Sequence, residues 1–155
     1  MDLLNQWLIL DSLPRMGSRG LLQRLGELPP QALFSFSADE LAARGFEPAQ
    51  VKALCHPDWA SIDTVHAWLS GDRRRRVLSY FDDDYPPLLK ETASPPLVLF
   101  CEGDGELLTT PQLAIVGSRR PTVSGRENAR RFAAELAGCG MTITSGLATG
   151  IDGEA

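Results

Sequence analysis

The sequence lacks the features of a secreted or membrane protein. Its three cysteines, Cys55, Cys101 and Cys139, are odd in number and widely spaced, which argues against a disulfide framework and a zinc site. No apolar run approaches the roughly 20 residues that a bilayer requires. The N-terminus has no positively charged signal region. We therefore expect a cytoplasmic protein with no membrane segment, no metal and no cofactor.

A positive net charge is also missing. The 155 residues carry 15 Lys and Arg against 20 Asp and Glu, a formal net charge of −5, which argues against a protein that coats nucleic acid by bulk electrostatics. The charge is uneven, however. Residues 77–112 hold one Lys against seven acidic residues, whereas residues 119–131 hold five Arg against Glu127 alone. An anion-binding surface should therefore be local and should include residues 119–131.

Residues 1–72 have the pattern of a small helical domain. Apolar residues recur at helical spacing, and proline and glycine separate the runs. Ser37 followed three residues later by Glu40 predicts a capping box, and Gly45 fits the end of that helix. Helices are predicted over 3–13, up to about Gly26, from Ser37 to Gly45, over 48–54 and over 60–70.

Residues 73–155 change to strand-type patterns. Apolar runs cover 77–81, 97–100, 113–116 and 141–144. Between the last two runs, one apolar helix face is formed by Ala129, Phe132, Ala133, Leu136 and Ala137. Continuous apolar strands around an amphipathic helix indicate a βαβ unit in a parallel sheet.

The first strand-to-helix junction, residues 114–125, has the chemistry of an anion site. Gly117 permits a tight turn that brings backbone N–H groups close to an anion. Ser118 adds a hydroxyl and Arg119 a planar guanidinium that matches phosphate, while the next helix contributes its N-terminal dipole. Arg119 and Thr122 occupy the second and third glycine positions of the dinucleotide fingerprint, which disfavours an NAD(P) site.

The second junction reads Ser145-Gly146-Leu147-Ala148-Thr149-Gly150-Ile151-Asp152. Its glycines and alanine again permit close backbone approach. Thr149 with Asp152 also fits a capping box for a following helix. Because parallel strands end at the same edge of a sheet, the two junctions together predict one shared anion pocket.

These two motifs closely resemble the DprA/Smf family of DNA-processing proteins. Further segments agree with that resemblance. They are Tyr85-Pro86-Pro87-Leu88-Leu89, Pro95-Pro96-Leu97-Val98-Leu99-Phe100 with Gly103, and Leu13-Pro14-Arg15-Met16-Gly17.

The resemblance implies a protein with no catalytic role that binds single-stranded DNA and helps load a RecA-type recombinase in natural transformation. It implies an α/β fold: a small helical SAM-like domain over 1–72, then an incomplete extended Rossmann-like parallel sheet over 73–155. It also implies a homodimer at full length. By the same resemblance, Asp152 braces the pocket and phosphates are held by Gly117, Ser118, Arg119, Thr122, Gly125, Ser145, Gly146, Ala148 and Gly150.

Two departures from the family pattern affect these expectations. Ser124 stands where family members often carry an aromatic, so any contact from that ring would be missing. The family pattern continues beyond Ala155 with a histidine and the rest of the sheet. We therefore expect a truncated Rossmann domain, with the dimerisation and recombinase surfaces outside these 155 residues.

Simpler interpretations compete at several positions. Arg119 would otherwise be a surface residue paired with the acidic segment 77–112. The arginines of 126–131 would form a solvated helix face, with Glu127 pairing Arg131 four residues on. The run Arg73–Arg76 fits a solvated interdomain linker compensated by nearby acids. The segment Gly17–Gly20 resembles a helix–hairpin–helix turn that grips DNA, but a plain tight turn is favoured.

Other functions also remain open. The main alternative is a nucleotide-binding or nucleotide-hydrolysing Rossmann protein of the lysine-decarboxylase-like group, although the PGGxGT-type motif of that group is absent. A third possibility is an inert truncated product. His56 and His66 lack ligand partners at metal spacing, and Asp82-Asp83-Asp84 fits a solvated turn better than a metal site.

Overall fold

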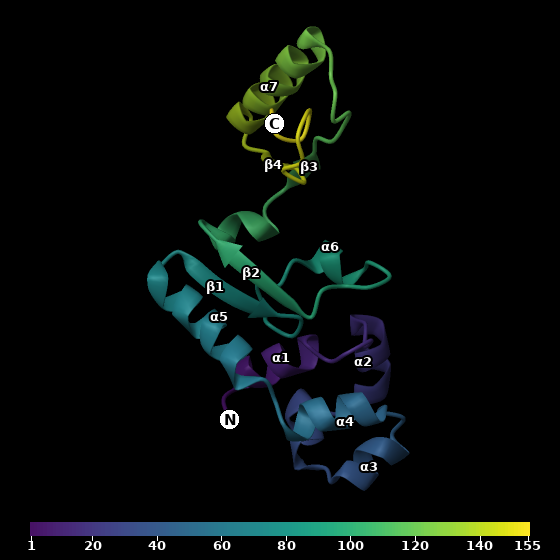
Figure 1. Ribbon diagram of the computed structural model, residues 1–155. Helices are drawn as coiled ribbons and strands as arrows, with labels where there is room; N and C mark the ends of the chain where they lie inside the picture. Colours follow the sequence, from purple (N-terminus) through teal and green to yellow (C-terminus); the bar gives the residue numbers. More distant parts are fainter. The chain divides into compact units, whose positions relative to one another are not determined.

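The fold is mixed α/β, with helices filling most of the first 71 residues and four short strands after them (Figure 1). The computed structural model describes residues 1–155, which divide into two compact units, 1–105 and 106–155. None of the helices has the length and apolarity needed to span a bilayer. The elements are α1 (Leu3–Asp11), α2 (Ser18–Leu25), the 3-10 helix η1 (Pro30–Ser35), α3 (Ala38–Ala43), α4 (Pro48–Cys55), α5 (Trp59–Gly71), β1 (Arg75–Ser79), α6 (Pro87–Lys90), β2 (Val98–Glu102), the 3-10 helix η2 (Gly105–Thr109), β3 (Gln112–Ala114), α7 (Val123–Gly138) and β4 (Thr142–Thr144).

Local sequence signals set several helix ends, as predicted. The Ser37 hydroxyl accepts the Glu40 N–H, and the Glu40 carboxylate accepts the Ser37 N–H at 2.7 Å, so the capping box that begins α3 is confirmed. Gly26 and Gly45 follow α2 and α3 with φ of 56° and 84°. Glycine adopts this left-handed conformation without the penalty that a Cβ imposes.

The helices of the first unit enclose an apolar core, and two glutamines, Gln6 and Gln50, are also buried. Trp7, Leu10 and Leu21 are among its fully buried side chains. Gln50, 2% exposed, donates from its side-chain amide to the Pro14 carbonyl at 3.0 Å. This bond satisfies a buried polar group and fixes the turn between α1 and α2.

Strands β1 and β2 belong to the first unit and pair antiparallel in a two-stranded sheet of their own, with Val77 opposite Phe100. The prediction of one parallel sheet over 73–155 is therefore wrong for these two strands. Trp68 of α5 meets Phe100 edge-on at 5.7 Å between ring centroids, so the strand pair packs against the helical part. All three tryptophans of the chain lie in this unit. The predicted boundary between residues 72 and 73 also falls inside it, and the domain assignment stays a prediction.

The arginine run Arg73–Arg76 is a solvated linker only in its first half, where Arg73 and Arg74 are exposed in the turn between α5 and β1. Arg75 and Arg76 lie in β1, where Arg75 pairs with Glu102 at 3.2 Å and Arg76 pairs with Asp84 at 2.6 Å. The guanidinium of Arg75 also lies over the Trp68 ring. The expected compensation by nearby acids is therefore found, but strand pairing, rather than a flexible connection, brings the charges together.

A buried tyrosine joins two of the segments that carry the family resemblance. Tyr85 is 1% exposed, and its hydroxyl donates to the Pro96 carbonyl at 2.7 Å. Burial raises the pKa of Tyr85 above its usual value. These segments hold the loop around α6 against the start of β2.

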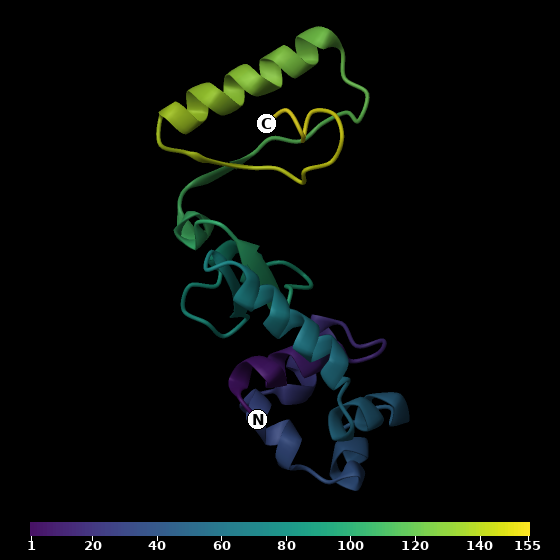
Figure 2. The ribbon, with the colours of Figure 1, turned by 60° about the vertical axis from the view of Figure 1, so that its left-hand side comes forward.

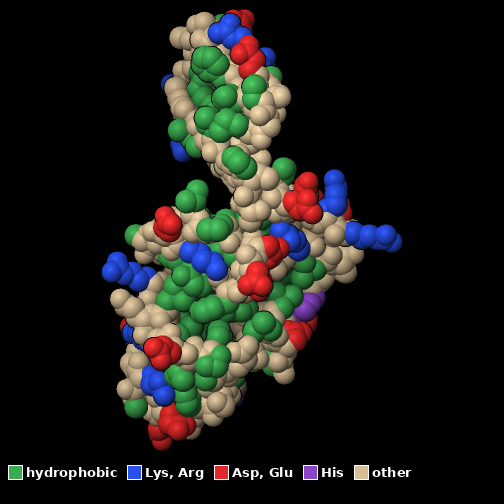
Figure 3. All heavy atoms as spheres, turned by 180° about the vertical axis from the view of Figure 1, so that it is seen from behind, with side chains coloured by type: hydrophobic (Ala, Val, Ile, Leu, Met, Phe, Trp, Pro, Cys, Tyr) green, Lys and Arg blue, Asp and Glu red, His purple; other side chains and the backbone are tan.

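The second unit is a βαβ unit (Figure 2). Strands β3 and β4 pair in parallel, with Leu113 opposite Ile143, as the pattern predicted for these two runs. Helix α7 connects them and packs through Ala129 and Ala133, both buried. Figure 3 shows hydrophobic side chains gathered on one face of this unit. A groove of the unit is lined by Leu107, Ala133, Ala137, Met141 and Ile143.

Candidate functional site

Two loops leave the same edge of the parallel strand pair. Strand β3 ends at Ala114 and β4 at Thr144, and the Ile115 N–H donates to the Thr144 carbonyl at 3.0 Å just beyond both strands. We call residues 115–122 the first loop and residues 145–152 the second loop. Their shared origin follows from the parallel register, and it is the position at which open α/β sheets bind ligands.

Three side-chain or backbone contacts tie the loops to each other. The Gly117 N–H donates to the Asp152 carboxylate at 3.1 Å, and the Ile151 N–H donates to the Ser118 carbonyl at 3.1 Å. The Ser145 hydroxyl lies 2.9 Å from the Ile115 carbonyl and 3.0 Å from the Asp152 carbonyl. The loops are therefore in direct contact, and the shared anion pocket that the two junctions predict stays a prediction.

Close backbone approach requires glycine at two of the predicted positions. A Cβ on Gly150, whose φ is 102°, would lie 2.2 Å from the Ser118 carbonyl oxygen. A Cβ on Gly117 would lie 2.8 Å from the side chain of Ile151. Any larger residue at either position would push the loops apart.

The first loop leads directly into the N-terminus of α7. Thr122 is the N-cap, and its hydroxyl accepts the Gly125 N–H at 3.1 Å. The Ser118 hydroxyl accepts the Arg120 N–H at 3.1 Å. No backbone carbonyl takes the N–H groups of Ser118 and Arg119. These donors and the helix dipole make the first loop favourable for an anion.

Fewer arginines near the loops are left without an ion pair than the sequence suggested. Arg119 and Arg120 are exposed and form no ion pair. By contrast, Arg126 pairs with Glu154 at 2.9 Å, and Arg130 pairs with the same carboxylate. The hydrogen bond from Arg126, with Arg130 beside it, holds the pKa of Glu154 below its usual range. The arginines without an ion pair are therefore Arg119 and Arg120 in the first loop and Arg131 further along α7.

Two local predictions in this region are wrong. Glu127 does not pair with Arg131, whose guanidinium instead donates to the Asn128 side chain at 3.3 Å. Thr149 does not cap a helix, since residues 149–154 form turns. Arg131 thus keeps a local partner on α7, whereas the Asp152 carboxylate binds the Gly117 N–H of the first loop.

The predicted site residues are thus brought together to different degrees. Gly117, Ser118, Ser145, Gly150 and Asp152 contact one another across the loops, and Thr122 and Gly125 form the start of α7. A Cβ on Gly146 would lie 3.1 Å from the Asp152 carboxylate, and the Ala148 carbonyl lies against Gly153. Their role in binding stays a prediction. Sequence reasoning missed Glu154, because nothing local marks it as a partner of α7.

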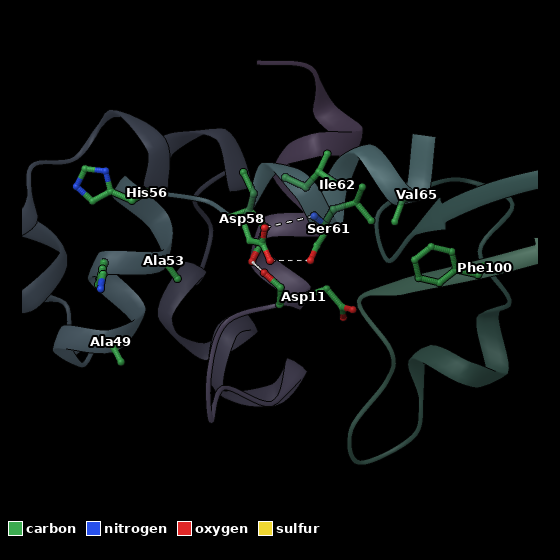
Figure 4. A pocket seen from close by; sticks show the side chains of 13 residues that line it. Asp11, Ala49, Ala53, His56, Asp58, Ser61, Ile62, Val65 and Phe100 are labelled. Carbon is green, nitrogen blue, oxygen red and sulfur yellow. Dashed lines mark hydrogen bonds between the residues drawn. The ribbon is translucent and has the colours of Figure 1, made fainter. Parts of the chain in front are cut away.

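The first unit contains a separate cavity of about 490 Å³ between α1, α4 and α5 (Figure 4). Burial raises the pKa of Asp11 on its wall. Asp58 caps α5 by accepting the Ser61 backbone N–H at 3.3 Å, and it also accepts the Ser61 hydroxyl at 2.7 Å. None of the predicted site residues lines this cavity.

The chain has no group of three or more His, Cys, Asp or Glu placed to hold a metal, and His66 pairs with Asn5 at 2.7 Å.

Comparison with known proteins assigns the family. Residues 76–155 match the model of the family described as DNA recombination-mediator protein A. The chain belongs to this family. Protein Smf of Escherichia coli K12 is 42% identical over 95 residues, which are 61% of this chain and 25% of that protein. DNA processing protein DprA of Bacillus subtilis is 44% identical over 70 residues, 44% of this chain and 24% of that protein. The chain thus spans about a quarter of these DprA/Smf relatives.

Solved structures include family members. The X-ray structure of DprA from Streptococcus pneumoniae is 25% identical, with a TM-score of 0.69 over 98% of this chain and 50% of that chain. A DprA structure from Helicobacter pylori, described as revealing a single-stranded DNA binding mode, is 35% identical, with a TM-score of 0.44 over 52% of this chain and 36% of that chain. The first likeness shows that the DprA fold extends through the helical part as well.

Proposed function

We propose that the chain captures single-stranded DNA through its phosphates, independently of sequence and without chemical change to the strand. Membership of a recombination-mediator family supports this, and the Helicobacter pylori member binds single-stranded DNA. The observation that carries the proposal is Arg119, exposed and without an ion pair beside the open N–H groups of the first loop. A guanidinium and backbone N–H groups bind phosphate oxygens through charge-assisted hydrogen bonds.

In this proposal, phosphates contact Ser118, Arg119 and the second loop, while Asp152 braces the pair of loops. Residues 73–155 would supply the first part of an extended Rossmann domain, preceded by a SAM-like domain over 1–72. The likeness to the Streptococcus pneumoniae structure supports this arrangement. It requires no cofactor, since the ligand is the strand itself.

The whole protein would act in the cytoplasm as a homodimer that hands the strand to a RecA-type recombinase. The family description as a recombination mediator supports this role. Because the chain spans about a quarter of its curated relatives, the surfaces for these partners are proposed to lie largely outside it.

The test is fluorescence anisotropy of a labelled oligo-dT with this chain at several salt concentrations. Binding by counterion release should weaken steeply as salt rises. Arg119→Ala should weaken binding about tenfold, as expected for one charge-assisted hydrogen-bonding group. It should also lower the log–log salt slope by about 0.7. Arg131→Ala, which removes an exposed arginine further along α7, is the matched control and should bind like the unmodified chain.

The outcomes separate the residue assignment from the function. Unchanged binding by Arg119→Ala would remove Arg119 from the site. Absence of any salt-sensitive binding by the folded chain would overturn the proposed function for these 155 residues. Displacement of the oligonucleotide by free ATP at equal concentration would favour the nucleotide-binding alternative.

A further inference from the structure

Leu147 combines two unfavourable features at the centre of the second loop. Its side chain is 87% exposed, the highest value among the exposed large hydrophobic residues of the chain. Its φ is 53°, and only Arg15 among the other non-glycine residues has a positive φ. The left-handed conformation is unfavourable for an L-residue, because its Cβ comes too close to the following carbonyl oxygen. Neither burial nor a relaxed backbone therefore explains a leucine here.

The contacts between the two loops impose this conformation. Ser145 is held by the Ile115 and Asp152 carbonyls on one side of Leu147. On the other side, Gly150 packs against the Ser118 carbonyl and Ile151 donates to it. A strained residue persists when its surroundings determine its geometry, and such residues cluster at ligand sites.

The turn itself does not require a leucine. Glycine adopts a positive φ without the penalty, and it would leave no apolar surface in water. The neighbouring Gly146 and Ala148 are small, so the leucine side chain is the only large apolar group between Ser145 and Gly150. What leucine adds at this position is an aliphatic surface available to a ligand.

The chemistry of the loop edge indicates which part of a ligand this surface meets. The first loop offers cations and N–H donors for phosphate, and it also carries exposed Val116, with exposed Val123 just after it at the start of α7. No aromatic residue lies in either loop, and the one aromatic of residues 106–155 is Phe132 on α7. Phosphate ligands beside uncovered aliphatic groups fit a strand whose bases are unpaired, because a duplex hides the base faces.

We infer that Leu147 packs against a nucleobase of the bound strand and makes the site prefer strands with accessible bases. The inference rests on the proposed capture of single-stranded DNA and adds a base contact to it. In this inference the two loops contact different parts of the strand: the first loop binds phosphate, and Leu147 of the second loop contacts the base. Removal of the Leu147 side chain should therefore abolish the base contact without changing the salt dependence of strand binding.

The experiment compares two labelled oligonucleotides of equal length, oligo-dT and an abasic strand with the same phosphates. The chain should bind oligo-dT about fivefold more tightly than the abasic strand, as expected for roughly 1 kcal/mol from partial burial of a leucine side chain against a base. Leu147→Gly should bind both strands with the affinity that the unmodified chain has for the abasic strand, with an unchanged salt slope. Leu88→Ala, which truncates another highly exposed leucine outside both loops, should keep the preference.

Folding is controlled within the same set of variants. Leu147→Gly relieves the backbone strain, so its thermal midpoint should not fall. Leu147→Asn introduces a polar residue that also tolerates a positive φ. This variant should likewise lose the preference for oligo-dT over the abasic strand. Equal affinity of the unmodified chain for both strands, or equal weakening of both by Leu147→Gly, would overturn the inference and leave phosphate capture standing. Failure of the unmodified chain to bind either strand would overturn the proposed function and this inference with it.

Discussion

The Asp152 carboxylate accepts the backbone N–H of Gly117 at 3.1 Å, across 35 residues of sequence. A carboxylate of the protein therefore occupies one of the donors that the turn after β3 presents to anions. The bond joins the ends of two parallel strands and holds the second loop against the first. The first two predictions test this connection.

Asp152→Asn should lower the stability of residues 106–155 by about 1 kcal/mol. The amide oxygen can still accept from Gly117, but a neutral acceptor gives a weaker hydrogen bond than a carboxylate. Thermal melting followed by circular dichroism measures the change. Asp83→Asn, which neutralises an exposed aspartate in the turn before Tyr85, is the control and should melt like the unmodified chain. Equal melting of Asp152→Asn and the control would contradict the bracing role.

Gly150→Ala should strongly destabilise the two loops. A methyl group there would lie 2.2 Å from the Ser118 carbonyl oxygen, and the φ of 102° is itself unfavourable for alanine. Amide hydrogen exchange at residues 115–122 and 145–152 should accelerate. Gly138→Ala is the matched control, because a Cβ at Gly138 has open space and alanine is the better helix former at the end of α7. Unchanged exchange in Gly150→Ala would show that the loops are not in contact.

Glu154→Gln should strengthen binding of oligo-dT. The change removes the carboxylate that neutralises Arg126 and Arg130, and it leaves two more cations near the first loop. The gain should be no more than about fivefold, since Arg126 and Arg130 are about half exposed or more and such ion pairs are worth at most about 1 kcal/mol. The salt dependence should become steeper. Anisotropy titration at two salt concentrations tests this, and weaker binding would place the strand away from the N-terminal half of α7.

Acid should destabilise the first unit partly through Asp72. Hydrogen bonds from the Arg74 side chain and backbone N–H lower the pKa of Asp72 from 3.8 to about 2. Because the folded pKa is depressed, this contribution to stability is complete above about pH 4 and is lost as the pH falls toward about 2. Urea midpoints over that range should therefore fall more steeply for the unmodified chain than for Asp72→Asn. Parallel pH profiles of the urea midpoint for the unmodified chain and Asp72→Asn would contradict the lowered pKa of Asp72.

The sequence predicted those features whose causes are local. The capping box of Ser37 and Glu40 and the glycine ends of α2 and α3 depend on residues within one turn, and all were found. The βαβ unit was also predicted, because a helix between two apolar runs forces them into a parallel pair. The direction of β1 and β2 depends on a loop of irregular structure, whose path no periodicity encodes.

Charge pairing was the least predictable level of the structure. The candidate pair of Glu127 and Arg131 had the correct spacing on one helix, yet Glu154 binds two other arginines of that helix from a separate segment. The same holds for Arg75 and Arg76, whose acidic partners arrive through strand pairing and a loop. Exposed ion pairs contribute too little energy to leave a sequence signature.

The placement of the aromatic residues gives the chain a built-in optical label. All three tryptophans and both tyrosines lie in residues 1–105, and residues 106–155 contain neither type. Tryptophan emission therefore reports the unfolding of the first unit alone, while far-ultraviolet circular dichroism reports both units. The difference between the two melting curves isolates the loop-bearing unit in the unmodified chain, without any dye.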